Sequence, residues 1–263
     1  MVDFKKNIVL FFFSFLALFS MAQDDTRASK NIPADAVRKI MVIPFDPKLY
    51  MSEIDNKINQ QTKWKFAKIR ENFRQQLNAQ LKLKLQSIAP VVSFYSDSVK
   101  MWKDLSYIYR STSLSYDLIE IPKDSKIKPA AAPNGIKNGQ LAVEVNTDKK
   151  FMNIKVNDAK LLSYLTGKYK TDYFVFINQL DIKNDPDSYD LAADTYKREI
   201  TVHYSIFDKA GKSISAGAEV SHFSSKENEP KKIVSINFSE IATDITSKLA
   251  AVIKPEVTKT QKK

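Results

Sequence analysis

The chain has 263 residues, 43% of them hydrophobic and 27% charged, a composition typical of a globular protein with one large or two small domains. It has no cysteine, which excludes disulfides, thiolate metal sites, cysteine nucleophiles and lipid attachment through an N-terminal cysteine. Its 41 Lys and Arg against 30 Asp and Glu give a net charge of +11, which favours an anionic partner or surface.

A charged start and a short apolar run open the sequence. Lys5 and Lys6 precede an apolar segment at 8–19, and small residues ending at Ala22 separate this segment from a polar stretch. The pattern predicts a secretory signal peptide over residues 1–22, whose cleavage would leave 263 minus 22, or 241, residues. The alternative is a membrane anchor, but the run is shorter than the ~20 apolar residues that cross a bilayer. No later stretch is long enough either, so we expect export to the periplasm or the outer-membrane periphery.

The rest of the chain is predicted to form a single α/β domain between two polar ends. The predicted segments are a leader at 23–38, the domain at 39–254 with an insertion at about 97–156, and a disordered basic tail at 255–263. The first strand is expected at Lys39–Phe45, where Asp46 and Pro47 end the apolar run, and another at Val91–Tyr95.

A long amphipathic helix is predicted over Gln60–Ser87. Its apolar stripe recurs at intervals of three and four residues and comprises Phe66, Ile69, Phe73, Leu77, Leu81, Leu85 and Ile88. The other side is basic, which is either a solvated face or a docking face for anionic lipid, glycan or an acidic protein. We take the following as candidate partner contacts, with Trp102 from the insertion: Lys63, Lys65, Lys68, Arg70 and Arg74.

The insertion combines an aromatic helix with loop-forming sequence. A helix is expected at Val99–Tyr109, and a long, lightly packed connection at Ile121–Gly139, where prolines and Asn134-Gly135 gather. The alternating segments Leu141–Val145 and Phe151–Val156 predict a small hairpin. The insertion is therefore a second candidate for partner contact.

The segment Lys170–Ile182 reads as the central strand of a mixed sheet covered by helices on at least one face. It is apolar on both sides from Tyr173 to Ile177 and then alternates. A helix capped by Asn157 or Asp158 and stopped by Gly167 is expected before it. An acidic loop is expected after it, at 181–194. Its aspartates lack the glycine and terminal glutamate of a helix-loop-helix calcium site.

A hairpin follows, with strands at Tyr196–Asp208 and Lys212–Phe223 joined by a turn with Gly211 in a left-handed conformation. The expected register pairs residues whose numbers sum to 420 and puts the following on one side: Ile200, Val202, Tyr204, Ile206, Ile214, Ala216, Ala218 and Val220. The two alanines leave room for a closing helix at Phe238–Ile253, started by Asn237 or Ser239. In this register His203 and His222 lie on opposite faces and do not share a metal.

The sequence contains none of the common catalytic signatures. Gly-x-Ser-x-Gly, Gly-x-x-x-x-Gly-Lys and His-Glu-x-x-His are all missing, and the chain has only 5 glycines and 2 histidines. We therefore assign no catalytic, cofactor or metal residue. Export argues against nucleic acid as the anionic partner, and the aromatic residues fall in core registers.

The order of elements resembles a group of envelope domains. A Val-Ile-Pro-Phe strand, an Asp-Tyr-Phe-Val-Phe strand, a hairpin with an Asp-Lys-Ala-Gly turn and a closing helix are similar to the N-terminal domain of TolB, CsgG and LpoB. The resemblance covers 40–45, 158–182 and 196–253. It implies a periplasmic or outer-membrane accessory module that binds proteins. The chain lacks the lipid-accepting cysteine of CsgG and LpoB and the propeller repeats of TolB. Residues Phe174–Leu180 also resemble an uncharacterised family of secreted bacterial proteins.

We therefore expect a non-catalytic exported protein that acts as an accessory or protein-interaction module of the envelope, without a cofactor. Its partner is expected to be an envelope protein or an anionic envelope surface. Two alternatives remain: an envelope hydrolase acting on glycan or peptide, and a carrier of a small or lipidic ligand.

Overall fold

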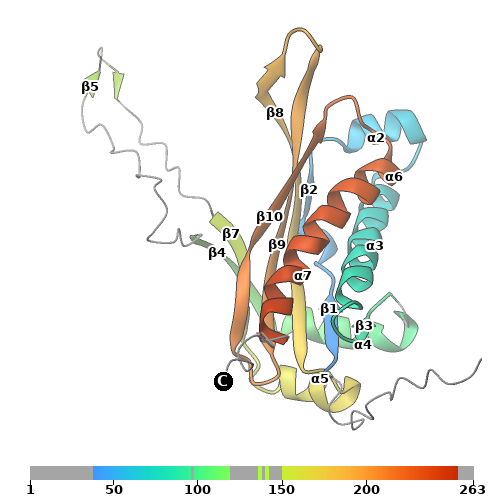
Figure 1. The fold of residues 1–263 in the computed structure, drawn as a ribbon, viewed down its shortest axis with the longest axis vertical. Coiled ribbons are helices and arrows are strands. Elements are labelled where there is room, and N and C mark those ends of the chain that lie inside the picture. Colours follow the sequence, from blue (N-terminus) through green and yellow to red (C-terminus); the bar gives the residue numbers. More distant parts are fainter. Residues whose placement is uncertain (1–37, 96–97, 119–135, 138–139, 142–149, 254–263) are drawn as a thin grey trace, which may run out of the picture. The chain divides into compact units, whose positions relative to one another are not determined.

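A computed structural model describes residues 38–95, 98–118, 136–137, 140–141 and 150–253 (Figure 1). The predicted signal peptide, nearly all of the polar leader, the basic tail and most of the predicted loop at 121–139 lie outside these residues. Within them, no helix combines the length and the apolar character needed to cross a bilayer.

The described elements are both strands and helices. The strands are β1 (Ile40–Ile43), β2 (Tyr50–Ser52), β3 (Val91–Ser93), β4 (Thr112–Leu118), β5 (Ile136–Lys137), β6 (Gln140–Leu141), β7 (Lys150–Val156), β8 (Tyr173–Asp190), β9 (Thr195–Asp208) and β10 (Ser213–Ser224). The helices are η2 (Pro47–Leu49), α2 (Asp55–Thr62), α3 (Phe66–Leu85), α4 (Ser98–Arg110), α5 (Leu161–Tyr169), α6 (Pro230–Ile233), the π-helix η3 (Val234–Phe238) and α7 (Ser239–Ile253).

The main sheet is mixed, in the order β10-β9-β8-β1-β3, and the predicted α/β class is confirmed. β8 is its central strand, as the sequence predicted. It is antiparallel to β9 on one side and parallel to β1 and then β2 on the other. The predicted acidic loop at 181–194 is wrong, because β8 continues to Asp190 and only a short turn follows.

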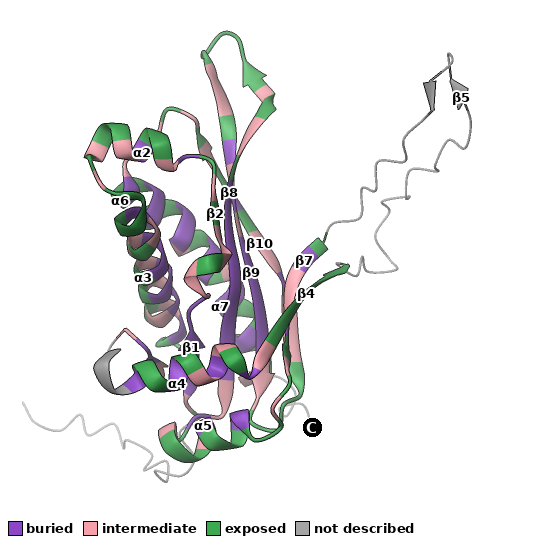
Figure 2. Ribbon diagram, turned by 180° about the vertical axis from the view of Figure 1, so that it is seen from behind, coloured by how far each residue is buried: buried purple, intermediate pink, exposed green. Residues whose placement is uncertain are grey.

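One side of the sheet, the α7 face, is covered by α3, η3 and α7. Figure 2 shows the buried residues gathered along the middle of β8 and β9. Alternate strand residues such as Val175, Val202 and Ile206 pack there against the helix stripe Ile69, Phe73, Leu77, Leu81 and Leu85. The predicted helix at 60–87 is two helices, because Lys63 takes a left-handed conformation (φ 60°) between α2 and α3. Phe66, predicted in the stripe, is 53% exposed.

The opposite side, the ribbon face, is covered by α4, α5 and the two-stranded ribbon of β4 and β7. Phe174 and Phe176 of β8 pack here against Leu105, Ile108 and Leu161. The predicted helix at 99–109 is confirmed as α4. The predicted pairing of 151–156 with 141–145 is wrong, because β7 pairs with β4 from Thr112–Val156 to Leu118–Lys150.

A buried carboxylate joins α4 to α5. Asp104, which is 5% exposed, accepts hydrogen bonds from Lys168 Nζ (2.7 Å), from the Tyr164 hydroxyl (2.9 Å) and from the Tyr169 hydroxyl. Burial alone would raise the pKa of Asp104, but the bonds from Lys168 and the two tyrosines hold it below its usual value. The two helices are therefore fixed to each other as well as to the sheet.

The predicted hairpin of β9 and β10 exists, but its register is shifted by one residue. Ile206 pairs with Ser215 and Val202 with Glu219, because an irregularity between Ser213 and Ser215 adds one residue to β10. The expected sum of 420 holds only at Phe207–Ser213. Ala216 and Ala218 therefore lie on the ribbon face, not beneath the closing helix. Gly217 lies on the α7 face instead, where an added Cβ would stand 3.6 Å from the Tyr204 hydroxyl.

The shifted register also corrects the prediction for the histidines. His203 pairs with Ala218 and His222 with Glu199, so both side chains project from the ribbon face. They remain far apart, because four residues along a strand correspond to about 13 Å. His203 is buried and His222 is exposed. The two therefore do not form a shared metal site.

The closing helix begins earlier than predicted. α6, η3 and α7 form one continuous helical run from Pro230 to Ile253, with a wider π turn in it. Asn237, a predicted cap, lies inside this run, where its Nδ2 donates to Ser221 Oγ (2.7 Å) and to the His222 carbonyl (3.2 Å). The wide turn keeps buried residues at intervals of four, at Ile233, Asn237, Ile241 and Ile245.

Two glycines are expected to respond to alanine in opposite directions. Gly211 has φ 82°, as predicted, so Gly211→Ala should lower the free energy of unfolding by about 1 kcal/mol. Gly167, predicted to stop α5, lies inside it with no atom within 4 Å of an added Cβ. Gly167→Ala should therefore raise stability by about 0.5–1 kcal/mol. Urea unfolding followed by circular dichroism measures both, and changes of the same sign would contradict these conformations.

Candidate functional site

A β-bulge in the middle of β8 organises the ribbon face. The pairing of β8 with β9 shifts between Ile177 and Gln179, so Asn178 is an extra residue. Before the bulge, apolar Phe176 lies on the ribbon face, whereas after it the polar Gln179 and Asp181 do. The bulge therefore divides this face into an apolar half under α4 and α5 and a polar half.

Side chains of the main sheet hold β7 in place. Asn178 Nδ2 donates to the Met152 carbonyl (2.8 Å), and the Met152 N–H donates to His203 Nδ1 (3.1 Å). Ser205 Oγ donates to Asn153 Oδ1 (2.7 Å). Because β7 shares a backbone ladder only with β4 among the described strands, these contacts seat the ribbon on the sheet.

Asp181 and His203 form a buried pair next to the contacts that hold β7 on the sheet. Because His203 Nδ1 accepts the Met152 N–H, its Nε2 carries the ring proton and faces Asp181 Oδ2 at 3.4 Å. Gln179 Nε2 donates to Asp181 Oδ1 (2.6 Å). Burial would raise the pKa of Asp181, but the hydrogen bonds from His203 and Gln179 keep it below its usual value. Both nitrogens of His203 are occupied, so neither is free to act as a general base.

A small pocket adjoins the bulge, between the end of β1 and the start of β4. Its volume is about 210 Å³, and its walls include Ile43, Pro44, Leu49, Leu114, Ile154 and Phe176, with Asp46, Lys48 and Asn178 among the polar residues. Asn178 is 1% exposed and its Oδ1 has no hydrogen-bond partner. An unsatisfied buried acceptor costs about 1–3 kcal/mol, which makes this bulge an unusual position in the sheet.

A buried cation lies close to this pocket. The guanidinium of Arg74 donates to the Phe45 carbonyl (2.7 Å), the Tyr95 hydroxyl (2.7 Å) and the Tyr109 hydroxyl (2.8 Å). Tyr109, which lines the pocket, in turn donates to the Pro44 carbonyl (2.7 Å). Burial raises the pKa of Tyr109 to about 12, so its hydroxyl keeps its proton. The prediction that Arg74 contacts a partner is wrong, because Arg74 is only 2% exposed.

The other predicted contact residues are accessible. Lys63, Lys65 and Lys68 are exposed where α2 meets α3, and Arg70 is half-buried. Trp102 is 59% exposed on α4, which packs on the ribbon face, whereas α3 packs on the α7 face. The structure therefore brings the lysines together but separates them from Trp102.

The sequence prediction missed an exposed apolar surface around β4, which we call the ribbon-side surface. β4 is exposed along most of its length (Figure 2), and the large apolar side chains Leu114, Tyr116 and Leu118 are 37%, 56% and 56% exposed. Met51 on β2 (52%) and Val220 on β10 (40%) belong to the same face of the main sheet. The alternation of Leu114, Tyr116 and Leu118 was the available signal for a strand here.

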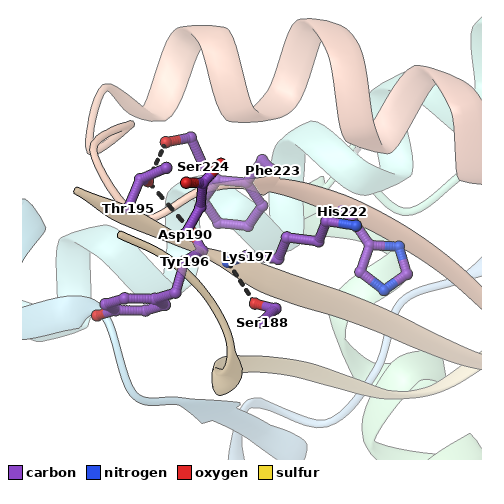
Figure 3. A pocket seen from close by; sticks show the side chains of 8 residues that line it. All are labelled: Ser188, Asp190, Thr195, Tyr196, Lys197, His222, Phe223 and Ser224. Atoms are coloured by element: carbon purple, nitrogen blue, oxygen red, sulfur yellow. Dashed lines mark hydrogen bonds between the residues drawn. The ribbon is translucent and has the colours of Figure 1, made fainter. Parts of the chain in front are cut away.

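A second pocket of about 320 Å³ lies at the far end of the β8–β9 hairpin (Figure 3). Its polar groups bond to one another: Thr195 Oγ1 lies 2.9 Å from Ser224 Oγ, and the Lys197 N–H donates to Ser188 Oγ (2.7 Å). Of the residues that the structure describes, no group of three or more His, Asp or Glu could hold a metal ion. Because its polar groups bond to one another, this second pocket presents fewer free polar groups than its composition suggests.

No family model and no curated protein matches the sequence. Among solved structures, the lipoprotein GNA1162 from Neisseria meningitidis is 10% identical with a TM-score of 0.35, covering 83% of this chain and 99% of its own. A candidate lipoprotein from Caulobacter crescentus CB15 is 12% identical with a TM-score of 0.23, covering 33% and 70%. Both similarities are too low to support an argument about function, and the resemblance to TolB-type domains remains a prediction.

Proposed function

We propose that the protein is a non-catalytic accessory module of the bacterial envelope that binds an envelope protein through the ribbon-side surface. The observation that carries the proposal is β4, an exposed strand that pairs only with β7 among the described strands. The predicted signal peptide supports export. The internal bonding of Asp181 and His203 supports binding rather than catalysis, because the buried histidine has no free nitrogen.

The backbone of β4 suits the addition of a partner strand. One edge of β4 pairs with β7, and its other edge has no strand partner among the residues that the structure describes. Leu114, Tyr116 and Leu118 point to the same side as their cross-strand neighbours, including the buried Ile154. A partner segment in extended conformation would gain backbone hydrogen bonds from the edge and apolar contacts from these side chains.

The basic junction of α2 and α3 is a separate candidate contact, for an anionic counterpart other than the protein that binds β4. Lys63, Lys65 and Lys68 are exposed there, and the net charge of +11 favours an anionic counterpart. The alternative of a lipid carrier gains no support from the pocket at the bulge. Its 210 Å³ is below the ~300–1,000 Å³ that drug-sized ligands occupy.

Replacing Leu114 and Leu118 together by serine should weaken binding of the protein partner by at least about tenfold, because each leucine buried at an interface contributes about 1.5–3 kcal/mol. The partner is first recovered from an envelope extract on the immobilised protein. Its affinity for each variant is then measured by calorimetry. Hydrogen exchange should show that the β4 amides become protected in the complex.

The matched control is the double variant Lys65→Gln and Lys68→Gln, which should leave this affinity within about threefold because the lysines lie on the other side of the sheet. The ribbon-side surface would be ruled out as the docking site if the partner bound both double variants equally well. The same would follow if the β4 amides stayed unprotected in the complex.

A further inference from the structure

We propose that the junction of α2 and α3 docks on an anionic lipid surface. This junction patch consists of Lys63, Lys65, Phe66 and Lys68, all of them exposed. The inference rests on the export that the proposed function assumes. It concerns the side of the molecule opposite to the ribbon, so it identifies a second partner rather than the protein that binds β4.

An aromatic ring is exposed next to the break between the two helices. Lys63 ends α2 in a left-handed conformation (φ 60°), which costs a residue other than glycine about 1–2 kcal/mol. Trp64, the next residue, packs partly against the core, and its ring lies 4.4 Å from Lys68 Nζ. Phe66, at the start of α3, is left 53% exposed.

The exposed ring lies in a strongly basic environment. Lys63, Lys65 and Lys68 are exposed within three residues of Phe66, and the first turn of α3 contains no acid. Figures 1 and 2 both show α6 next to α2; α6 adds the exposed Lys231, whereas Lys232 is paired with Glu229 (3.1 Å) and Glu227 (3.7 Å). Three exposed lysines therefore lie close to the ring, with no acid in the first turn of α3.

An anionic bilayer fits this combination better than an acidic protein or glycan does. Headgroups attract exposed lysines with about 1 kcal/mol each, and the region below them accepts an aromatic ring. A highly hydrated glycan offers no apolar region for Phe66. Short surface-bound segments of peripheral proteins use the same pairing of basic and aromatic side chains.

The test measures sedimentation of the processed, exported protein with vesicles. We expect binding to equimolar phosphatidylcholine and phosphatidylglycerol, which added salt weakens, and little binding to phosphatidylcholine alone. The double variant Lys65→Gln and Lys68→Gln should bind the anionic vesicles about 30-fold more weakly. Phe66→Ser, which keeps the charge, should lose about tenfold.

The matched control is Lys150→Gln with Lys155→Gln, an equal loss of charge on the exposed side chains of β7. This control should lose less than threefold, and so should the Leu114 and Leu118 double serine variant. An equal loss in the β7 control would mean that net charge alone drives binding and would overturn the proposal. So would a Phe66→Ser variant that binds like the unaltered protein, or a failure of the unaltered protein to bind. None of these results would affect binding at β4, which the partner assay measures separately.

Discussion

Replacing Arg74 by methionine is expected to lower the free energy of unfolding by about 3 kcal/mol. Methionine fills a similar volume but donates no hydrogen bond. The substitution leaves the Phe45 carbonyl and the hydroxyls of Tyr95 and Tyr109 without the charged donor that now bonds all three. Because Tyr109 also holds the Pro44 carbonyl, the end of β1 should loosen as well. Urea unfolding followed by tryptophan fluorescence measures the change.

Arg70→Met is the matched control, since Arg70 is one turn away on the same helix but only half-buried. We expect it to change stability by less than about 0.5–1 kcal/mol. If the Arg74 and Arg70 variants were equally stable, the buried guanidinium would not be tying α3 to β1, and its hydrogen bonds would contribute little in water.

Asp181→Asn is expected to destabilise the protein by about 2 kcal/mol at neutral pH, because it weakens the hydrogen bonds that a charged acceptor receives from His203 and Gln179. The pKa of Asp181 is lowered in the folded protein. Its contribution is therefore complete above the ordinary aspartate pKa of about 4 and is lost as the pH falls through the lower folded value. The two proteins should become nearly equal in stability in strong acid.

Unfolding curves recorded from neutral pH to strong acid test this. Asp187→Asn is the control: it removes an exposed carboxylate from the same strand beyond the polar cluster and should leave the pH profile close to that of the unaltered protein. A stability difference for Asp181→Asn that stays constant with pH would show that the carboxylate acts through its shape rather than its charge.

The parts of the fold that follow from periodicity could be predicted from the sequence. The run from Tyr173 to Ile177 is apolar on both sides, as a strand between two covered faces requires. The repeat from Ile69 to Leu85 likewise fixes one buried side of α3. Both apolar patterns are local in sequence, and each is repeated over several buried residues.

Single-residue irregularities could not be predicted in the same way. One extra residue at Asn178 and one near Ile214 reverse which side of the sheet the following residues occupy. The prediction that His203 and His222 lie on opposite faces was wrong for this reason. The left-handed conformation of Lys63 divides the predicted long helix into two. It could not be predicted, because nothing in the lysine side chain favours that conformation.

Long-range partners were the other source of error. β7 was expected to pair with the nearest alternating segment, but its partner β4 lies more than thirty residues earlier in the chain. Arg74 looked like a solvent-facing residue because it is charged. It follows the buried Phe73, however, and three acceptors from distant segments satisfy it. Spacing alone does not reveal such acceptors, and the ribbon-side surface was missed for a similar reason.

The way the ribbon is attached has a mechanical consequence. At its root, the N–H groups of Asn157 and Asp158 donate to the Ser111 carbonyl at 2.9 and 3.3 Å, which clamps the two strands together. Farther out, β7 is held to the main sheet by side-chain hydrogen bonds and by the packing of Ile154. A force on the outer end of the β4–β7 ribbon would thus load these side-chain contacts first. The backbone hydrogen bonds of the six-stranded sheet would be strained only after them. Because the ribbon is fixed at its inner end, a force applied at Leu118 would be transmitted along it to the bulge at Asn178.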